Sequence, residues 1–161
     1  MPLFSVNAQQ TDRWENWKSL IGDWLGEGSG EPGDGSGSFS FTFDLEQNIL
    51  VRKHNYVYIK DKAYLVFNDM TIIYLVNGTP SKAIFFDSEG YSRNYTISYS
   101  GKTITLISEK IPQMPTFRIT YTLIDDANVI YRYEISRDGV NYITYVEETG
   151  KKKLLTSGQG N

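Results

Sequence analysis

The sequence has 161 residues, a formal net charge of -3 and 14% aromatic residues, among them 12 Tyr and 8 Phe, with no Cys. This length suits one domain with one core, and an acidic chain has no basic field to gather phosphates, so general nucleic-acid binding is disfavoured. The absence of cysteine excludes disulfides and zinc-thiolate sites, and no apolar run approaches the roughly 18 residues that a transmembrane helix needs.

Residues 1–10, MPLFSVNAQQ, precede the first predicted element. Val6-Asn7-Ala8 has the small-residue pattern of a signal-peptidase site, although the segment lacks a basic start and a full apolar stretch. Two interpretations stay open: the remnant of a signal peptide, or an ordinary flexible N-terminus. The first favours an exported or periplasmic location over a cytoplasmic one.

Residues 11–21 form the one predicted helix. Asp12 and Glu15 have the spacing of a capping box. Apolar residues recur at helical intervals at Trp14, Trp17 and Ile21. A short helix with one apolar side needs a surface to cover, and we expect it to cap one end of a barrel.

Short strands separated by turn residues follow the helix. We expect strands at 22–25, 38–45, 49–59, 69–76, 82–87, 91–99, 103–108, 116–123, 129–136 and 142–149. Separators such as Asn77-Gly78 supply positive φ. Strands spaced by roughly 8 to 12 residues indicate consecutive antiparallel pairing, and closure removes exposed edges. The fold prediction is all-β, a single antiparallel up-and-down β-barrel of about ten strands over residues 11–153, followed by a C-terminal tail at 154–161.

Residues 26–37, GEGSGEPGDGSG, are the one compositionally biased segment. Gly28, Gly30 and Gly33 match a dinucleotide-binding spacing, but a strand follows them where that site needs a helix N-terminus. We therefore interpret the segment as a flexible connection, with a gate at the barrel rim as the alternative.

The order of a helix, Gly-x-Trp and about ten antiparallel strands resembles the calycins, the barrel group of lipocalins and fatty-acid-binding proteins. The residues that resemble the opening of their nitrobindin-like branch are Leu20, Gly22-Asp23-Trp24, Gly26, Gly28, Gly30 and Pro32. The resemblance implies that Trp24 closes the barrel floor beneath a basic residue of a late strand, which is Arg132 or Arg118 here.

The same resemblance implies a haem ligand, a histidine near the end of the barrel. The single histidine, His54, lies on an early predicted strand, and the last two predicted strands contain none. Tyr142 and Tyr145 lie in the corresponding region, and Tyr ligates haem iron in some proteins. With the family ligand missing, haem binding is disfavoured and no cofactor is expected.

Side chains of a strand alternate between two faces. One face of residues 49–59 carries Leu50, Arg52, His54, Tyr56 and Tyr58, and the other carries Val51, Lys53, Asn55, Val57 and Ile59. We favour the first face for the barrel interior, because ligand sites combine aromatic walls with a few polar groups. The alternative is an outer tyrosine face with Val and Ile inside.

Two later predicted strands also carry charge. Arg132 and Glu134 share one face, and Arg118 shares a face with Thr120 and Thr122. Pointing inward, these residues would form a polar cluster able to hold a carboxylate, since buried charges need partners. Pointing outward, they would be a solvated stripe.

We expect a protein that binds a small apolar or amphipathic ligand inside the barrel, near Arg52, His54, Tyr56, Tyr58, Arg118, Arg132 and Glu134. Catalysis is not favoured, because Glu147 and Glu148 point oppositely and no partner for His54 follows from spacing. No metal site is expected either. The rivals are an enzyme centred on His54 and a filled barrel that serves as a structural or interaction module. Oligomeric state and ligand identity have no signal in the sequence.

Overall fold

The structure is a computed structural model that describes residues 12–27, 36–60 and 63–154, without the side chains of residues 58–60. The N-terminal segment with its signal-peptide interpretation, most of the glycine-rich segment and residues 155–161 lie outside the described residues.

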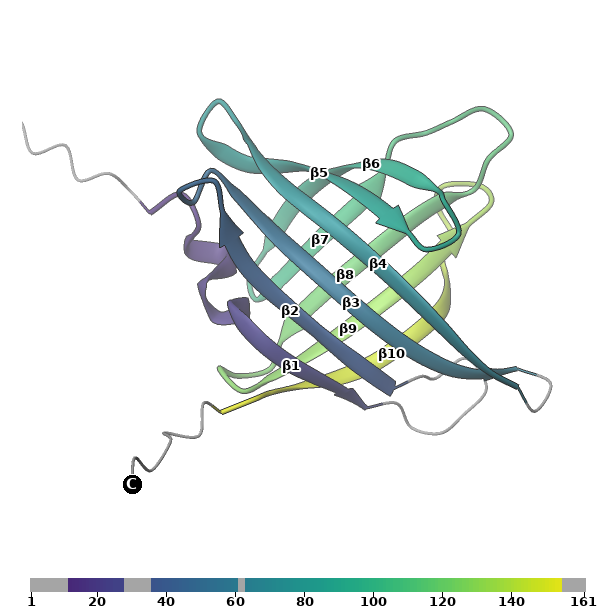
Figure 1. Cartoon of the computed structure of the whole chain (residues 1–161). Coiled ribbons are helices and arrows are strands. Elements are labelled where there is room, and N and C mark those ends of the chain that lie inside the picture. Colours follow the sequence, from purple (N-terminus) through teal and green to yellow (C-terminus); the bar gives the residue numbers. More distant parts are fainter. Residues whose placement is uncertain (1–11, 28–35, 61–62, 155–161) are drawn as a thin grey trace, which may run out of the picture.

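Ten antiparallel strands form one closed barrel (Figure 1), which confirms the predicted fold class. The strands are β1 (Gly22–Glu27), β2 (Ser36–Asp44), β3 (Ile49–Lys60), β4 (Ala63–Val76), β5 (Thr79–Asp87), β6 (Ser92–Ser100), β7 (Thr103–Ser108), β8 (Thr116–Leu123), β9 (Asn128–Ser136) and β10 (Ile143–Lys152). Each strand pairs with its neighbour in sequence, and β10 closes the barrel against β1. The interior is therefore lined by every second residue of each strand.

The helix is shorter than predicted and of a different type. It is a 3-10 helix, η1 (Glu15–Leu20), where the sequence predicts a helix over residues 11–21. The buried side chains Trp14, Trp17 and Leu20 recur every third residue, which is the period of a 3-10 helix. Asp12 accepts a hydrogen bond from the Trp14 backbone N–H at 3.0 Å, so its cap is a local turn and not a capping box.

η1 covers one end of the barrel, called the helix end below (Figure 1). Trp14 packs edge-on against Phe43, and Trp17 donates a hydrogen bond from Nε1 to the Tyr99 hydroxyl at 2.8 Å. Trp17 also contacts the rings of Phe41 and Tyr121. These contacts fill the interior behind the helix.

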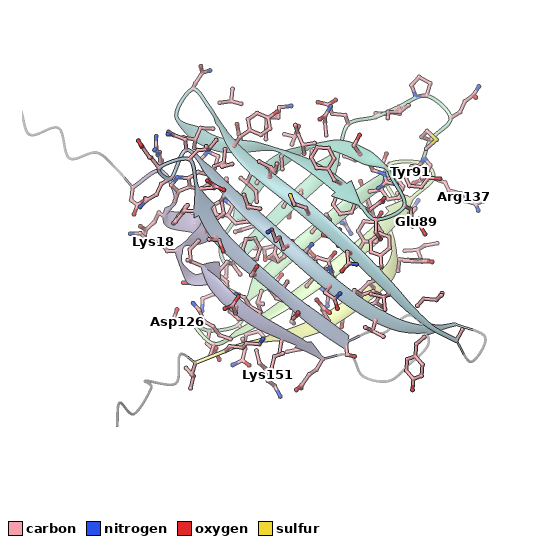
Figure 2. The ribbon with its side chains drawn as sticks, viewed as in Figure 1. Lys18, Glu89, Tyr91, Asp126, Arg137 and Lys151 are labelled. Atoms are coloured by element: carbon pink, nitrogen blue, oxygen red, sulfur yellow. The ribbon has the colours of Figure 1, made fainter. Side chains whose placement is uncertain are left out.

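The opposite end, called the far end below, carries the β5–β6, β7–β8 and β9–β10 connections. In Figure 2, Glu89 and Tyr91 of the β5–β6 turn and Arg137 of the β9–β10 turn lie on the side of the barrel opposite Lys18 of the helix. Among the described residues no helix lies at this end. The two ends of the barrel are therefore built differently.

Trp24 is fully buried near the helix end, as the family resemblance implies. Its ring stacks on Phe39 with centroids 5.8 Å apart, and its Nε1 donates to the Leu20 carbonyl at 2.8 Å. The cation over its ring is Lys152, whose Nζ lies 5.3 Å from the centroid. The expectation of Arg118 or Arg132 in this place is corrected, because both lie on outward-facing positions of β8 and β9.

Candidate functional site

The inward face of β3 carries the polar residues of the barrel interior. Arg52, His54 and Tyr56 are buried, whereas Lys53 and Asn55 between them are exposed. The face favoured from the sequence is thus the one that points inward. The side chain of Tyr58 lies outside the described residues.

Arg52 has no exposed surface. Its Nη1 pairs with the Asp69 carboxylate on the adjacent strand. The guanidinium carbon lies 4.8 Å from the Tyr131 ring centroid and 5.7 Å from those of Phe39 and Tyr121. Burial alone would lower the pKa of Arg52, but Asp69 and the other acidic neighbours outweigh it and raise that pKa above its ordinary value. Arg52 is therefore a charged residue sealed inside an aromatic cage.

His54 links two carboxylates. Its Nδ1 lies 2.9 Å from Asp69 Oδ2, and its Nε2 lies 3.1 Å from Glu148 Oε1 on β10. Since a carboxylate can only accept, Nδ1–H is the donor to Asp69. Neither Glu148 oxygen has a hydrogen-bond partner of good geometry among the described residues. Sequence reasoning missed both as partners of His54, because Asp69 depends on the register of β4 against β3 and Glu148 reaches His54 from β10, which is not adjacent to β3.

Two tyrosines complete this cluster. Burial raises the pKa of Tyr121 and Tyr131, with Arg52 acting in the opposite direction. Both phenols therefore stay neutral over the physiological range. Together with Phe39 they form an apolar wall around the Arg52–Asp69 pair.

The structure places Arg118, Arg132 and Glu134 on outward positions of β8 and β9, although Glu134 is buried there and is not part of a solvated stripe. Arg118 donates two hydrogen bonds to Glu134, at 2.6 and 3.0 Å, and Arg132 pairs with Glu147. Tyr121 and Tyr131, which alternate with them, are buried. These charges are satisfied on the outside of the barrel.

A further arginine faces inward at the far end. Arg93 is on β6, two residues before the buried Tyr95, and its guanidinium carbon lies 4.2 Å from the Phe117 ring centroid. Its Nη1 lies 3.6 Å from Asp87 Oδ2, and its side chain is 17% exposed. The period-two pattern of β6, with Tyr95, Ile97 and Tyr99 inward, is the signal in the sequence that could have found it.

The far-end interior is apolar and half-buried. Phe117 and Tyr133 stack with centroids 5.8 Å apart, and Val146 is paired with Tyr133 in the sheet. Phe67, Tyr133 and Ile135 face inward, yet each keeps part of its surface exposed. Behind the helix, Phe41 and Tyr121 are fully buried, whereas Phe43, Tyr99 and Leu123 at that end are also only partly buried.

A hollow of about 550 Å³ lies on the outer face of the barrel. Ser40, Lys53 and Met70 in its lining are direct cross-strand neighbours on outward positions of β2, β3 and β4. His54 and Asp69 also border the hollow, because a single strand layer separates it from the interior. It is a surface groove and not the barrel lumen.

Within the described ranges, no group of three His, Asp or Glu side chains could hold a metal ion. Asp69 and Glu148 contact opposite nitrogens of His54, so they share no point where an ion could sit. The helix of the described region is 6 residues long, and no described helix has the length and apolarity needed to cross a membrane.

No protein-family model and no curated protein matches the chain. A solved structure that it resembles is Rv2717c from M. tuberculosis, with 13% sequence identity and a TM-score of 0.60 over 89% of this chain and 98% of that chain. The likeness shows the fold alone. It supports the barrel fold, while the resemblance to the calycins and to their nitrobindin-like branch stays a prediction.

Proposed function

We propose that this protein is a binding protein that holds a small apolar or amphipathic ligand inside the far end of its barrel. The observation that carries this proposal is that Phe67, Tyr133 and Ile135 face inward at the far end and keep part of their surface exposed. Aromatic walls with few polar groups are typical of small-molecule sites, and barrels of this size are able to enclose one such ligand.

The helix end is a poor location for a ligand. Trp17, Phe41 and Tyr121 pack there ring against ring, and all three are fully buried. At the helix end the interior is packed with side chains, as the alternative of a filled barrel expects. That alternative does not account for the inward apolar surface that remains accessible at the other end.

The enzyme alternative draws support from one observation, the bond between His54 and Asp69, because an orienting carboxylate is part of a general-base pair. A general base also needs a substrate proton within reach of its free nitrogen. His54 Nε2 is buried and faces Glu148 instead. Binding is therefore the better-supported function.

The test is displacement of a polarity-sensitive dye, 1-anilinonaphthalene-8-sulfonate, by small apolar and amphipathic compounds, followed by native mass spectrometry of the protein. Two variants locate the site. Val146→Phe adds a ring to the far-end interior, and Ser40→Phe adds the same ring to the outer hollow.

We expect saturable one-to-one binding that Val146→Phe weakens by at least about tenfold, because overpacking closes the space, and that Ser40→Phe leaves unchanged. Loss of binding in Ser40→Phe alone would move the site to the outer hollow. Absence of saturable binding in the unmodified protein would overturn the proposal.

A further inference from the structure

Arg93 is a cation of the far-end interior that keeps hydrogen-bond donors accessible. A guanidinium has five N–H donors in a fixed fork. The guanidinium of Arg93 makes no hydrogen bond to any described residue, and the carboxylate oxygen it pairs with, Oδ2 of Asp87, is 3.6 Å from Nη1. Arg52 is different, because it is sealed from solvent and paired with Asp69 at hydrogen-bond distance.

Asp87 is held away from Arg93 by the β5–β6 turn. Its Oδ1 accepts the backbone N–H groups of Glu89 at 3.1 Å and Tyr91 at 2.9 Å. The carboxylate is thereby fixed in the turn, where it neutralises Arg93 only from one side. The remaining edge of the fork is available to a second acceptor.

The ring of Phe117 fixes the plane of this guanidinium. With its carbon 4.2 Å from the ring centroid, Arg93 stacks on an aromatic face that is itself stacked on Tyr133. The ring centroids of Phe85 and Tyr91 also lie 5.7 and 5.6 Å from this carbon, so aromatic contacts hold the side chain in place. An ordered guanidinium suits bidentate recognition of a carboxylate. The adjoining surface of Tyr133 and Ile135 is apolar.

Buried charged residues limit how far a ligand could enter the barrel from the far end. Below the far-end residues lie His54, Asp69 and the caged Arg52, whose side chains are 3% exposed or less. An extended acyl chain would have to pass this charged layer, at a large desolvation cost. A flat, compact apolar group fits the space beside Tyr133 better.

We propose that Arg93 binds the carboxylate of a compact aromatic acid, with the aromatic part held beside Phe117 and Tyr133. This inference rests on the proposed function and names its ligand class. The residues outside the barrel, Arg118 and Arg132, take no part because each is already paired with a glutamate.

The experiment compares three head groups on one aromatic body by isothermal titration calorimetry: 2-naphthylacetate, 2-(2-naphthyl)ethanol and 2-(2-naphthyl)ethylamine. We expect the acid to bind at least about tenfold more tightly than the alcohol, since hydrogen bonds to charged groups are the stronger kind, and the amine to bind most weakly. Dodecanoate should bind more weakly than 2-naphthylacetate.

Arg93→Gln should reduce the affinity for the acid to that for the alcohol and leave the alcohol unaffected. Arg93→Lys should restore part of the difference, because charge returns without the fork, and Arg132→Gln should change neither affinity. Equal binding of acid and alcohol, or an unchanged acid affinity in Arg93→Gln, would overturn the inference and leave the proposed function standing. If none of the compounds binds, the inference and the proposed function both fail. The head-group comparison uses the unmodified protein, so it does not depend on the folding of any variant.

Discussion

Glu148 Oε1 faces His54 Nε2 across 3.1 Å inside the barrel, and Glu148 has no hydrogen-bond donor of good geometry among the described residues. The neighbouring pair of Arg52 and Asp69 is neutral as a unit. Glu148 is therefore the carboxylate of this cluster that lacks a hydrogen-bonded partner among the described residues. The two buried acids should respond differently to neutralisation.

Asp69→Asn should destabilise the fold by about 3 to 5 kcal/mol, because it leaves Arg52 charged and buried without its partner. Glu148→Gln should change the free energy of unfolding by less than about 1 kcal/mol, since the amide keeps the shape and supplies a donor to His54. Urea denaturation of both variants measures this, with Glu147→Gln as the outer-face control. Equal losses for Asp69→Asn and Glu148→Gln would contradict the assignment of the Arg52 charge to Asp69.

Gly26 lies directly against Glu148. A Cβ at position 26 would lie 2.4 Å from Glu148 Oε2, so Gly26→Ala should destabilise by about 1 to 3 kcal/mol. In a Glu148→Ala background the same change should cost much less, because the obstacle is gone. A double-mutant cycle with no coupling energy would show that the two residues are not in contact.

Trp24→Ala should destabilise the protein by roughly 3 to 5 kcal/mol, as a large-to-small change at a fully buried site. Lys152→Met should have a smaller effect, about 0.5 to 1 kcal/mol, which is the range for an accessible cation over an aromatic ring. Thermal melts followed by circular dichroism measure both. An unchanged melting temperature for Trp24→Ala would mean that the indole is not part of the core.

Stability should fall as pH rises above about 10. Burial raises the pKa of Tyr95, Tyr121, Tyr131 and Tyr133 above the ordinary value near 10. The unfolded chain then loses these protons at lower pH than the folded one, so their contribution is present below about pH 10 and is lost above it. Tyrosinate absorbance at alkaline pH should show these four groups ionising together with the loss of the β-sheet signal in circular dichroism. Ionisation of all 12 tyrosines in the intact fold would contradict their burial.

The strands were predictable because alternation and turn residues are local signals. The start of β4 was not, since Tyr64, Leu65, Val66 and Phe67 are consecutive apolar residues without alternation. The helix type was missed because periods of three and of 3.6 are indistinguishable over two turns. On β3 the inward face was predictable, whereas the partners of Arg52 and His54 come from β4 and β10 and depend on register.

For Arg93, too, the sequence predicts the direction of the side chain but not its contacts. Its inward position follows from the alternation of β6, but its distance from Asp87 and its stacking on Phe117 arise from pairing between strands. The glycine-rich segment, which attracts most notice in the sequence, lies largely outside the described residues.

The most direct test of the account is a methyl-detected NMR titration of the protein with 2-naphthylacetate. The account predicts saturable shifts of the Val146 and Ile135 methyl signals at the far end, with those of Met70 in the outer hollow and Ile104 behind the helix unchanged. Shifts at Met70 with Val146 unaffected, or no saturable shift at all, would contradict a ligand site inside the far end of the barrel.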